Sequence, residues 1–283
     1  MNTTKVTYIP QGSIGQIISY LEQKKFYLSP SVDKYLLYFI GQPQSGWIDI
    51  GERRLSRGDF LYKLSNSKAA MNEIKLIPGE TIDVFLYQIS QKYKLSYKKL
   101  MQYYLKYSPI RDGLIVPETY HIPIGIGERH LVLYLINYAW KKHKETSMKI
   151  FGEFDKNSWY RYLTIASIIQ KEAANKEEMP LVSSVIYNRL KKGMKLQMDG
   201  TLNYGKFSHI KVTSKRIKED KSKYNTYINR GLPVYPVSSV SNEAIFAAIF
   251  PKKTSYLYFV KSKKGKHAFS KTYKEHMVNI KRK

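Results

Sequence analysis

Apolar and polar positions in residues 1–73 indicate alternating short strands and helices. Residues 5–9 alternate as in a half-buried strand and end at a turn over residues 10–12. Ser13 then precedes a helical stripe made of Ile14, Ile17, Ile18 and Leu21. A second strand is predicted over residues 46–51, and a second short helix follows Ser56. We therefore expect a small N-terminal α+β module.

Residues 74–126 predict the order strand, helix, helix, strand. A strand from Ile74 ends at Pro78-Gly79, and Thr81 then offers an N-cap for the first helix. A second helix is predicted around residues 95–104, and residues 113–122 close the unit. This order is typical of a carbohydrate-binding LysM-like subdomain, although many small α+β modules share it.

Residues 127–283 contain the strongest helical pattern and the first candidate for chemistry. After a long amphipathic helix near residues 130–144, the apolar residues Ile165, Ile168 and Ile169 share one helical face with Glu172. Apolar neighbours and a helix C-terminus both disfavour a charged carboxylate and raise its pKa, as a general acid requires. The alternative is an exposed glutamate at the edge of the apolar stripe.

Polar loops follow this helix. Glu178 precedes a helix predicted to start at Pro180 and to end at Gly193; the pattern favours a helix cap over a second carboxylate facing Glu172. Amide, carboxylate and aromatic side chains then gather in two loops, at residues 194–205 and 224–233. Such side chains suit sugar recognition, because hydroxyls need polar partners and pyranose faces pack on rings. Residues 261–266 predict a hairpin turn between two strands.

Charge and composition narrow the classes of function. The chain has 48 lysines and arginines against 22 aspartates and glutamates, a formal net charge of +26. Such a charge favours an anionic partner, or it is simply solvated; its spread along the chain argues against nucleic acid. The chain has no cysteine, and its six histidines form neither an HExxH pattern nor a close pair, so no metal site is predicted. No apolar run approaches the roughly 18 residues that span a bilayer.

Ordered sequence blocks from about residue 112 to residue 276 resemble the MltG/YceG-like endolytic murein transglycosylases of bacteria. The blocks are DGLIVPETY at 112–120, ASIIQKE at 166–172, VSSVIYNRL at 182–190, GMKLQMDGT at 193–201, YNTYINRGLP at 224–233 and the closing segments at 256–260 and 267–276. The resemblance implies that Glu172 is the single catalytic acid/base. With the polar loops, it implies a substrate-binding set of Gln197, Asp199, Thr201, Tyr204, Tyr224, Asn225, Thr226, Glu178, Asn188 and His267.

The chain also departs from the family pattern. Gln170 stands where the family often has glutamate, which argues against a two-carboxylate mechanism that uses this position. Met179 replaces an arginine, which leaves the role of Glu178 open, and Gly200 and Val234 replace prolines. The family's N-terminal membrane anchor is expected to be absent from this chain.

The resemblance implies a three-part α+β protein, with the module at residues 1–73, the LysM-like subdomain at 74–126 and a YceG-like catalytic domain at 127–283. The implied reaction cleaves the β-1,4 bond between N-acetylmuramic acid and N-acetylglucosamine in nascent peptidoglycan strands, leaves 1,6-anhydro ends and terminates strand elongation. It needs no cofactor. Expected partners are peptidoglycan strands, peptidoglycan synthases and an anionic membrane surface, not nucleic acid, at the outer face of the cytoplasmic membrane in the bacterial envelope.

Two other classes of protein stay open at this point. One is a peptidoglycan hydrolase in which Glu172 works with a second carboxylate, either Glu178 or Asp199. The other is a non-catalytic glycan-binding scaffold that acts through the LysM-like subdomain.

Overall fold

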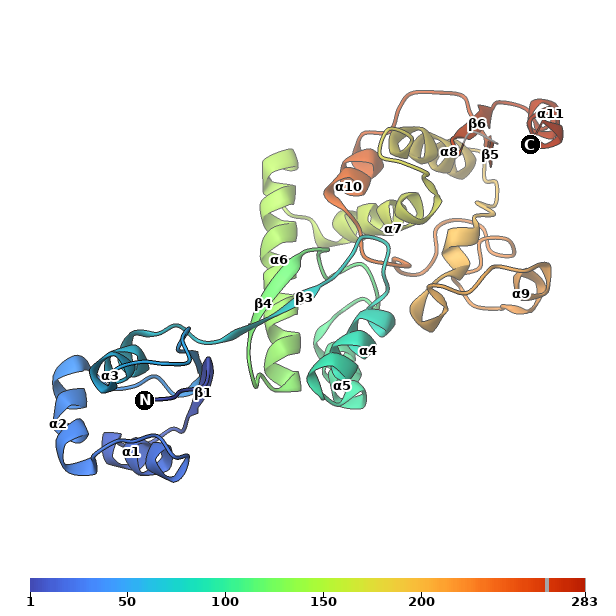
Figure 1. The fold of residues 1–283 in the computed structure, drawn as a ribbon. Coiled ribbons are helices and arrows are strands. Elements are labelled where there is room, and N and C mark those ends of the chain that lie inside the picture. The colour runs from blue at the N-terminus through green and yellow to red at the C-terminus, as the bar shows by residue number, and fades with distance from the viewer. Residues whose placement is uncertain (263–264, 283) are drawn as a thin grey trace. The chain divides into compact units, whose positions relative to one another are not determined.

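The computed structural model describes residues 1–262 and 265–282, which form two compact units (Figure 1). The first unit comprises residues 1–74 and 119–127, and the second comprises residues 75–118 and the chain from residue 128 onward. Both units combine helices with short two-stranded sheets. This composition confirms the predicted α+β class.

The first unit contains the predicted strands and helices. Strand β1 (Val6–Ile9) pairs antiparallel with β2 (Gly46–Asp49), so that Val6 lies opposite Asp49. Helix α1 (Ile14–Gln23) begins at Ser13, whose side chain forms a capping box with Gln16. Helices α2 (Pro30–Ile40) and α3 (Arg57–Asn66) complete the unit.

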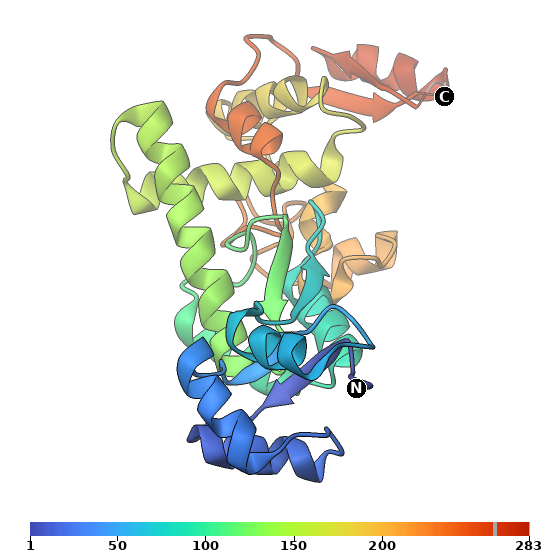
Figure 2. The ribbon, with the colours of Figure 1, turned by 60° about the vertical axis from the view of Figure 1, so that its left-hand side comes forward.

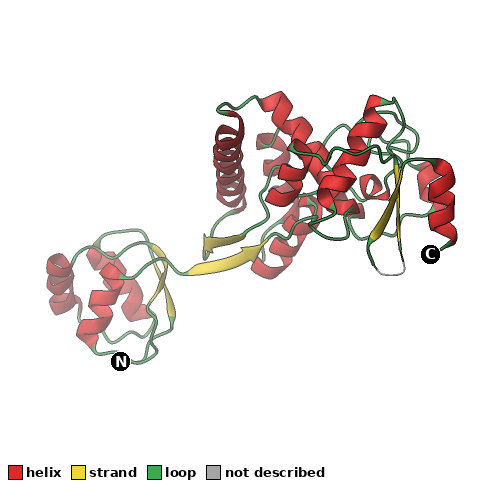
Figure 3. Ribbon diagram, turned by 90° about the horizontal axis from the view of Figure 1, so that it is seen from above, coloured by secondary structure: helices red, strands yellow, loops and turns green. Residues whose placement is uncertain are grey.

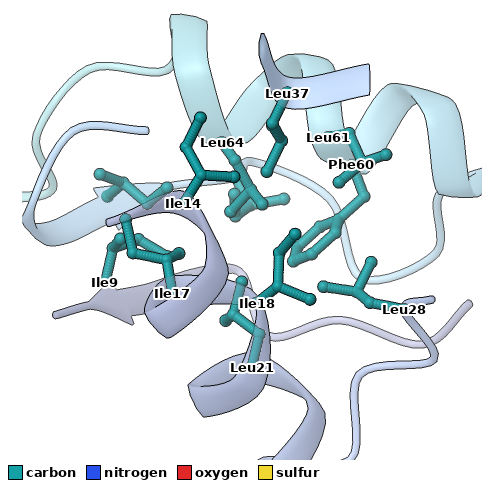
Figure 4. Packing of buried hydrophobic residues seen from close by; sticks show 12 residues of the cluster. Ile9, Ile14, Ile17, Ile18, Leu21, Leu28, Leu37, Phe60, Leu61 and Leu64 are labelled. Atoms are coloured by element: carbon teal, nitrogen blue, oxygen red, sulfur yellow. The ribbon is translucent and has the colours of Figure 1, made fainter. Parts of the chain in front are cut away.

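The core of this unit lies between the three helices and the β1–β2 sheet (Figure 4). Helix α1 contributes the residues predicted from its spacing, α3 contributes Phe60, Leu61 and Leu64, and α2 contributes Leu37. The ring of Phe26 stacks on Phe60 with centroids 5.1 Å apart. Burial of these apolar side chains is the main stabilising contribution to the unit.

An ion pair attaches α2 to α3. Asp33 is fully buried, and Arg57 donates from Nε and Nη2 to its Oδ1 at 2.7 and 2.6 Å. The other carboxylate oxygen of Asp33 accepts the backbone N–H of Ser29 at 2.6 Å, at the start of α2. Helix α2 is therefore fixed by one inward-facing carboxylate as well as by Leu37.

The predicted LysM-like order is present along the chain. Strand β3 (Met71–Lys75) pairs with β4 (Thr119–Pro123), and helices α4 (Ile82–Tyr93) and α5 (Tyr97–Tyr107) lie between them in sequence. Thr81 caps α4 as expected, since its hydroxyl accepts the N–H of Val84. The strands fall almost wholly in the first unit and the helices in the second. The three-part division at residues 73 and 126 stays a prediction.

Helices make up most of the second unit (Figures 2 and 3). Helix α6 (Glu128–Phe151) extends beyond both predicted ends. Helix α7 (Lys156–Glu172) packs against α8 (Met179–Lys191) and α10 (Asn242–Ile249). Helix α7 is thereby enclosed along most of its length, and its last residue is Glu172.

Short elements surround the C-terminal end of α7. The 3₁₀ turn η1 (Asp199–Leu202) lies in the first polar loop, and η2 (Gly205–Phe207) begins at its last residue. Helix α9 (Ser214–Glu219) lies between the two polar loops. Strand β5 (Tyr258–Lys261) pairs antiparallel with β6 (His267–Ser270), and α11 (Tyr273–Lys281) follows. Residues 263–264 of the predicted hairpin turn lie outside the described residues. Among the helices of the described chain, none is long and apolar enough to cross a membrane.

Arg57→Ala should destabilise the first unit by about 2–4 kcal/mol, because it leaves a buried carboxylate without its guanidinium. Asp33→Asn should cost less, since the amide carries no charge. Urea unfolding followed by amide hydrogen exchange in residues 1–74 measures both. An equal decrease in the free energy of unfolding of the two variants would contradict a role for the buried Asp33 charge in fixing α2.

Candidate active site

Glu172 occupies the C-terminal end of α7 because the helix is apolar up to that point. Ile165, Ile168 and Ile169 are fully buried, as their spacing predicted. Two polar side chains of the same helix bind neighbouring segments. The hydroxyl of Ser167 accepts the N–H of Val237 at 3.0 Å, and the Gln170 amide oxygen accepts the N–H of Ser241 at 3.1 Å. Gln170 thus places a hydrogen-bond acceptor at the N-cap of α10 without adding a second carboxylate near Glu172.

A cavity of about 320 Å³ opens beside the Glu172 side chain, within the usual size range of ligand sites. The residues that line it with Glu172 are Arg189, Leu196, Gln197, Met198, Asp199, Tyr227, Tyr258, Phe259, Tyr273 and His276. They come from α8, the loop around η1, the 224–233 loop, β5 and α11. The cavity therefore combines one helix-end carboxyl with aromatic rings and a few polar groups.

Burial controls the protonation of Glu172. Desolvation raises the pKa of its carboxyl to about 7, and the negative charge of Asp199 acts in the same direction. The backbone N–H of Gly200, which donates to Oε1 at 2.7 Å, and the charge of Arg189 oppose that rise. The carboxyl is therefore protonated in a large fraction of molecules near neutral pH, as a general acid requires.

Gly200 can make this hydrogen bond because it has no side chain. A Cβ at this position would lie 2.5 Å from the Cβ of Lys171 and 2.9 Å from Oε1 of Glu172. Only a glycine allows the η1 backbone to approach the end of α7 so closely without a local shift.

Thr226 holds the loop that carries Gln197 and Asp199. Its carbonyl accepts the N–H of Gln197 at 3.2 Å, and its hydroxyl accepts the N–H of Met198 at 3.1 Å and lies 3.0 Å from the Thr201 hydroxyl. Gln197 has a left-handed backbone (φ 49°), which is unfavourable for a residue with a side chain. The Thr226 contacts fix that conformation at the cavity wall.

The 224–227 segment is fixed in turn by its own side chains. Asn225 is fully buried; its amide donates to the carbonyls of Ile217 and Asp220 at 2.8 and 2.7 Å. Tyr224 stacks on Tyr204 with ring centroids 4.3 Å apart. Tyr227 reaches the cavity, where its hydroxyl donates to Asp199 at 2.6 Å.

Arg189 and the C-terminal aromatic residues form another wall of the cavity. Arg189 donates to the carbonyls of Leu257 and Leu196, and its guanidinium lies 5.2 Å from the Tyr258 ring centre. The Tyr258 ring also stacks on His276 at 5.2 Å. Burial, and then the charge of Arg189, lower the pKa of His276, whose Nδ1 is buried without a hydrogen-bond partner among the described residues. A neutral imidazole therefore faces the site.

Glu178 lies at the N-cap position of α8, but its side chain caps no amide, so the capping interpretation is wrong. Instead, its two oxygens contact His267: the backbone N–H donates to Oε1 at 2.8 Å, and Nδ1 lies 2.7 Å from Oε2. Desolvation would raise the pKa of Glu178, but the hydrogen bonds and charge of His267 outweigh it and lower that pKa. This nearly buried pair attaches β6 to the start of α8.

Asn188 attaches the neighbouring strand to the same helix. Its amide donates to the carbonyls of Thr254 and Tyr256, both at 2.9 Å. Asn188 thus holds the chain just before β5, whereas Glu178 holds His267 at the start of β6, next to the hairpin turn. None of the three residues lines the cavity.

Three of the predicted site residues, Glu172, Gln197 and Asp199, line the cavity directly. Thr201, Asn225 and Thr226 lie buried beneath it, and Tyr204 and Tyr224 form the neighbouring ring stack. The sequence prediction missed the lining residues Arg189, Tyr227, Tyr258, Phe259, Tyr273 and His276. All six lie inside the blocks that carry the family resemblance, and Tyr227 lies in the second polar loop, but the other five have no polar-loop pattern of their own.

Metal ligands do not gather at this site. Within the described residues, no group of three or more histidine, cysteine, aspartate or glutamate side chains could hold a metal ion. The chemistry available to the described site is proton transfer by Glu172, with Asp199 as a second carboxylate in the same cavity.

A carboxyl whose pKa is raised by desolvation, in a cavity lined by aromatic rings, suits glycan cleavage, in which a general acid protonates the glycosidic oxygen. The pattern of the YceG-like family matches residues 7–282, and the chain belongs to this family. The chain is 42% identical over 168 residues to a Bacillus subtilis protein named endolytic murein transglycosylase, with 58% of this chain and 46% of that protein covered. It is 36% identical over 187 residues to a Streptococcus pneumoniae R6 protein of the same name, with 60% and 31% covered.

The fold also matches a solved structure. A crystal structure of a YceG-like protein from Listeria monocytogenes superimposes with a TM-score of 0.63 at 26% identity, covering 98% of this chain and 99% of that one. By contrast, the chain spans less than half the length of the Bacillus and Streptococcus relatives.

The raised pKa of Glu172 predicts a pH-dependent cost in stability. Below the ordinary value of 4.5 the carboxyl is protonated in both folded and unfolded chains. Between pH 4.5 and about 7 the unfolded chain loses this proton first, so folding stability falls as pH rises. Glu172→Gln removes this loss and should stabilise the protein by about 1–3 kcal/mol above pH 7, and much less near pH 4.

Urea unfolding of both proteins across this pH range provides the measurement. Glu177→Gln, an exposed neighbour in the following turn, controls for loss of one carboxylate. A stability difference that does not change with pH would contradict the raised pKa.

Proposed function

We propose that this protein is an endolytic lytic transglycosylase. It cleaves the β-1,4 bond between N-acetylmuramic acid and N-acetylglucosamine in nascent peptidoglycan and leaves 1,6-anhydro ends, which terminates strand elongation. The observation that carries the proposal is the Glu172 carboxyl, whose pKa is raised to about 7 at the wall of an aromatic cavity. The names of the Bacillus and Streptococcus relatives support the substrate class.

Glu172 acts first as the acid. The Gly200 N–H binds Oε1, which favours negative charge on that oxygen and leaves Oε2 to carry the proton. Oε2–H protonates the bridging oxygen as the bond to the anomeric carbon of the muramic residue breaks. Positive charge then develops on the muramic ring in an oxocarbenium-like transition state.

Glu172 acts next as the base. Its carboxylate takes the proton from the 6-hydroxyl of the same muramic ring, and that oxygen bonds to the anomeric carbon. The substrate's acetamido oxygen assists. The glutamate regains its proton and water is not consumed, so no second carboxylate is needed.

Different residues of the cavity wall have different roles in binding the sugar. We assign hydroxyl recognition to Gln197 and Asp199, and ring packing to Tyr227, Tyr258 and Phe259, because these side chains line the cavity. Thr201, Asn225, Thr226, Tyr204 and Tyr224 act by holding the loops in position. Asn188, Glu178 and His267 act by fixing the β5–β6 hairpin, which supplies the aromatic wall.

Charge supports a negatively charged partner for the second unit. The first unit has nine basic and six acidic residues, whereas the second has 39 basic and 16 acidic residues. Lactyl and stem-peptide carboxylates make peptidoglycan anionic, and exposed lysines attract such a polymer. We place the protein in the cell envelope, at the outer face of the cytoplasmic membrane, beside the peptidoglycan synthases that supply nascent strands.

The second candidate function is a hydrolase in which Asp199 is the second carboxylate. It is favoured by one observation, namely that Asp199 and Glu172 line the same cavity. Glu178 is a weaker choice for this role, because both of its oxygens are bonded to His267.

Glu172→Gln should lower cleavage of purified peptidoglycan by about 10²–10⁴-fold, because glutamine keeps the shape of glutamate but cannot transfer a proton. Mass spectrometry of the released fragments measures rate and product end together. Glu177→Gln serves as the matched control and should cleave at the rate of the unmodified protein. Undiminished turnover by Glu172→Gln would exclude the assignment, and retained glycan binding without cleavage by any form would indicate a scaffold.

The product end separates the two enzyme classes. Asp199→Asn should slow the reaction but keep 1,6-anhydro ends, since the transglycosylase needs only Glu172. Reducing ends in the products of the unmodified protein, lost together with activity in Asp199→Asn, would establish the hydrolase instead.

The pKa of Glu172 also predicts a pH profile. Since the acid must be protonated to start the reaction, kcat/KM should stay level below about pH 7 and fall about tenfold per pH unit above it. Initial rates on soluble glycan strands across pH 5–9 measure this profile. A rate that rises through pH 7 would assign the raised pKa to a general base.

A further inference from the structure

Helix α2 has apolar residues on two faces, of which only one is packed. Leu37 points into the core of the first unit, beside Phe60 and Leu64 (Figure 4). The opposite stripe consists of Val32, Tyr35, Leu36 and Phe39, and all four are exposed. Their spacing of i, i+3, i+4 and i+7 is the one that surface helices normally turn inward.

The degree of exposure is unusual for such residues. Phe39 is 92% exposed and Tyr27, which precedes the helix, is 82% exposed; Tyr38 is also exposed. Aromatic rings gathered in this way on a surface mark a binding face more often than a solvated one.

The charges around this stripe are mainly positive, with Glu22 at the end of α1 as an exposed carboxylate among them. Asp33, the single acidic residue in the sequence of α2, is fully buried and bonded to Arg57. Lys24 and Lys25 are exposed in the turn before the helix, and Lys34 lies on the helix itself. The exposed face of α2 therefore offers rings, methyl groups and ammonium groups, but no carboxylate.

A groove with both polar and apolar lining runs beside the stripe. It has a volume of about 720 Å³ and lies between α1 and α2. Its polar lining includes Gln16, Ser19, Gln23 and Lys34, and its apolar lining includes Tyr20 and Pro30. Tyr35 borders both the groove and the apolar stripe. An apolar ridge next to a groove that carries hydrogen-bonding groups and one lysine complements an amphiphile with an anionic head.

We propose that this face of α2 binds the surface of an anionic phospholipid bilayer. The helix, about 16 Å long, lies parallel to the membrane plane. Phe39, Tyr35 and Leu36 enter the region between headgroups and acyl chains, while the lysines and the groove contact lipid phosphates. A bilayer fits better than a second copy of the chain, because the net positive charge of this face would oppose a self-complementary contact.

Site-directed labelling tests the proposal, because the chain has no cysteine of its own. Phe39→Cys carries a nitroxide at the C-terminal end of the stripe, at its most exposed position. Tyr62→Cys, on α3 of the same unit and 60% exposed, carries the matched control. On vesicles of equimolar phosphatidylglycerol and phosphatidylcholine, the label at 39 should become protected from an aqueous nickel relaxant and accessible to oxygen, while the label at 62 should not change. The same aqueous access at both positions would overturn the proposal.

Affinity provides a second, independent measurement. Tyr35→Ser combined with Phe39→Ser should weaken binding to these vesicles at least tenfold in flotation assays, and Tyr62→Ser should not. Thermal unfolding and peptidoglycan cleavage of the double variant should match the unmodified protein, since both side chains are exposed and lie outside the active site. Unchanged vesicle binding by the double variant would overturn the proposal. A dimer in sedimentation that the double variant abolishes would instead make the stripe a contact between two copies of the chain.

Discussion

Desolvation of one carboxyl group is the constraint on which the site depends. A glutamate at the end of a buried helix would normally be solvated and charged. In this protein α8, α10 and the η1 loop pack around the end of α7, so that the Glu172 carboxyl is desolvated and its pKa rises to about 7. The chemistry of the site therefore depends on the packing of the second unit. Any loosening of α7 against its neighbours would rehydrate the Glu172 carboxyl and lower its pKa.

The sequence predicted the elements whose signal is local. The Ile165, Ile168 and Ile169 spacing predicted α7 and the burial of its end, and Ser13, Ser56 and Thr81 predicted helix starts that the structure confirms. Periodicity and capping are properties of a few consecutive residues, so a single sequence contains them. The α+β class followed from these elements.

The rest of the site depends on contacts between distant segments. No local pattern shows that Glu178 bonds His267 across 89 positions in place of capping α8, or that Thr226 supports Gln197. The aromatic wall was missed for the same reason: Tyr258, Tyr273 and His276 lie in ordinary strand and helix patterns, and only the hairpin fold brings them to Glu172. The same limit applies to α2. Its sequence is apolar on two faces, and only the contacts with α1 and α3 show that Leu37 is buried and the stripe is exposed.

The backbone N–H of Gly200 lies close enough to Glu172 to lower the pKa of its carboxyl, so this one backbone position affects the strength of the acid. Proline, which the family pattern carries here, has no N–H to offer and would hold the loop further from the helix end. A glutamate facing such a loop would lose a donor that lowers its pKa, and would hold its proton more tightly. A change from glycine to proline at position 200 is therefore expected to raise the pKa of the acid without altering any side chain that lines the cavity.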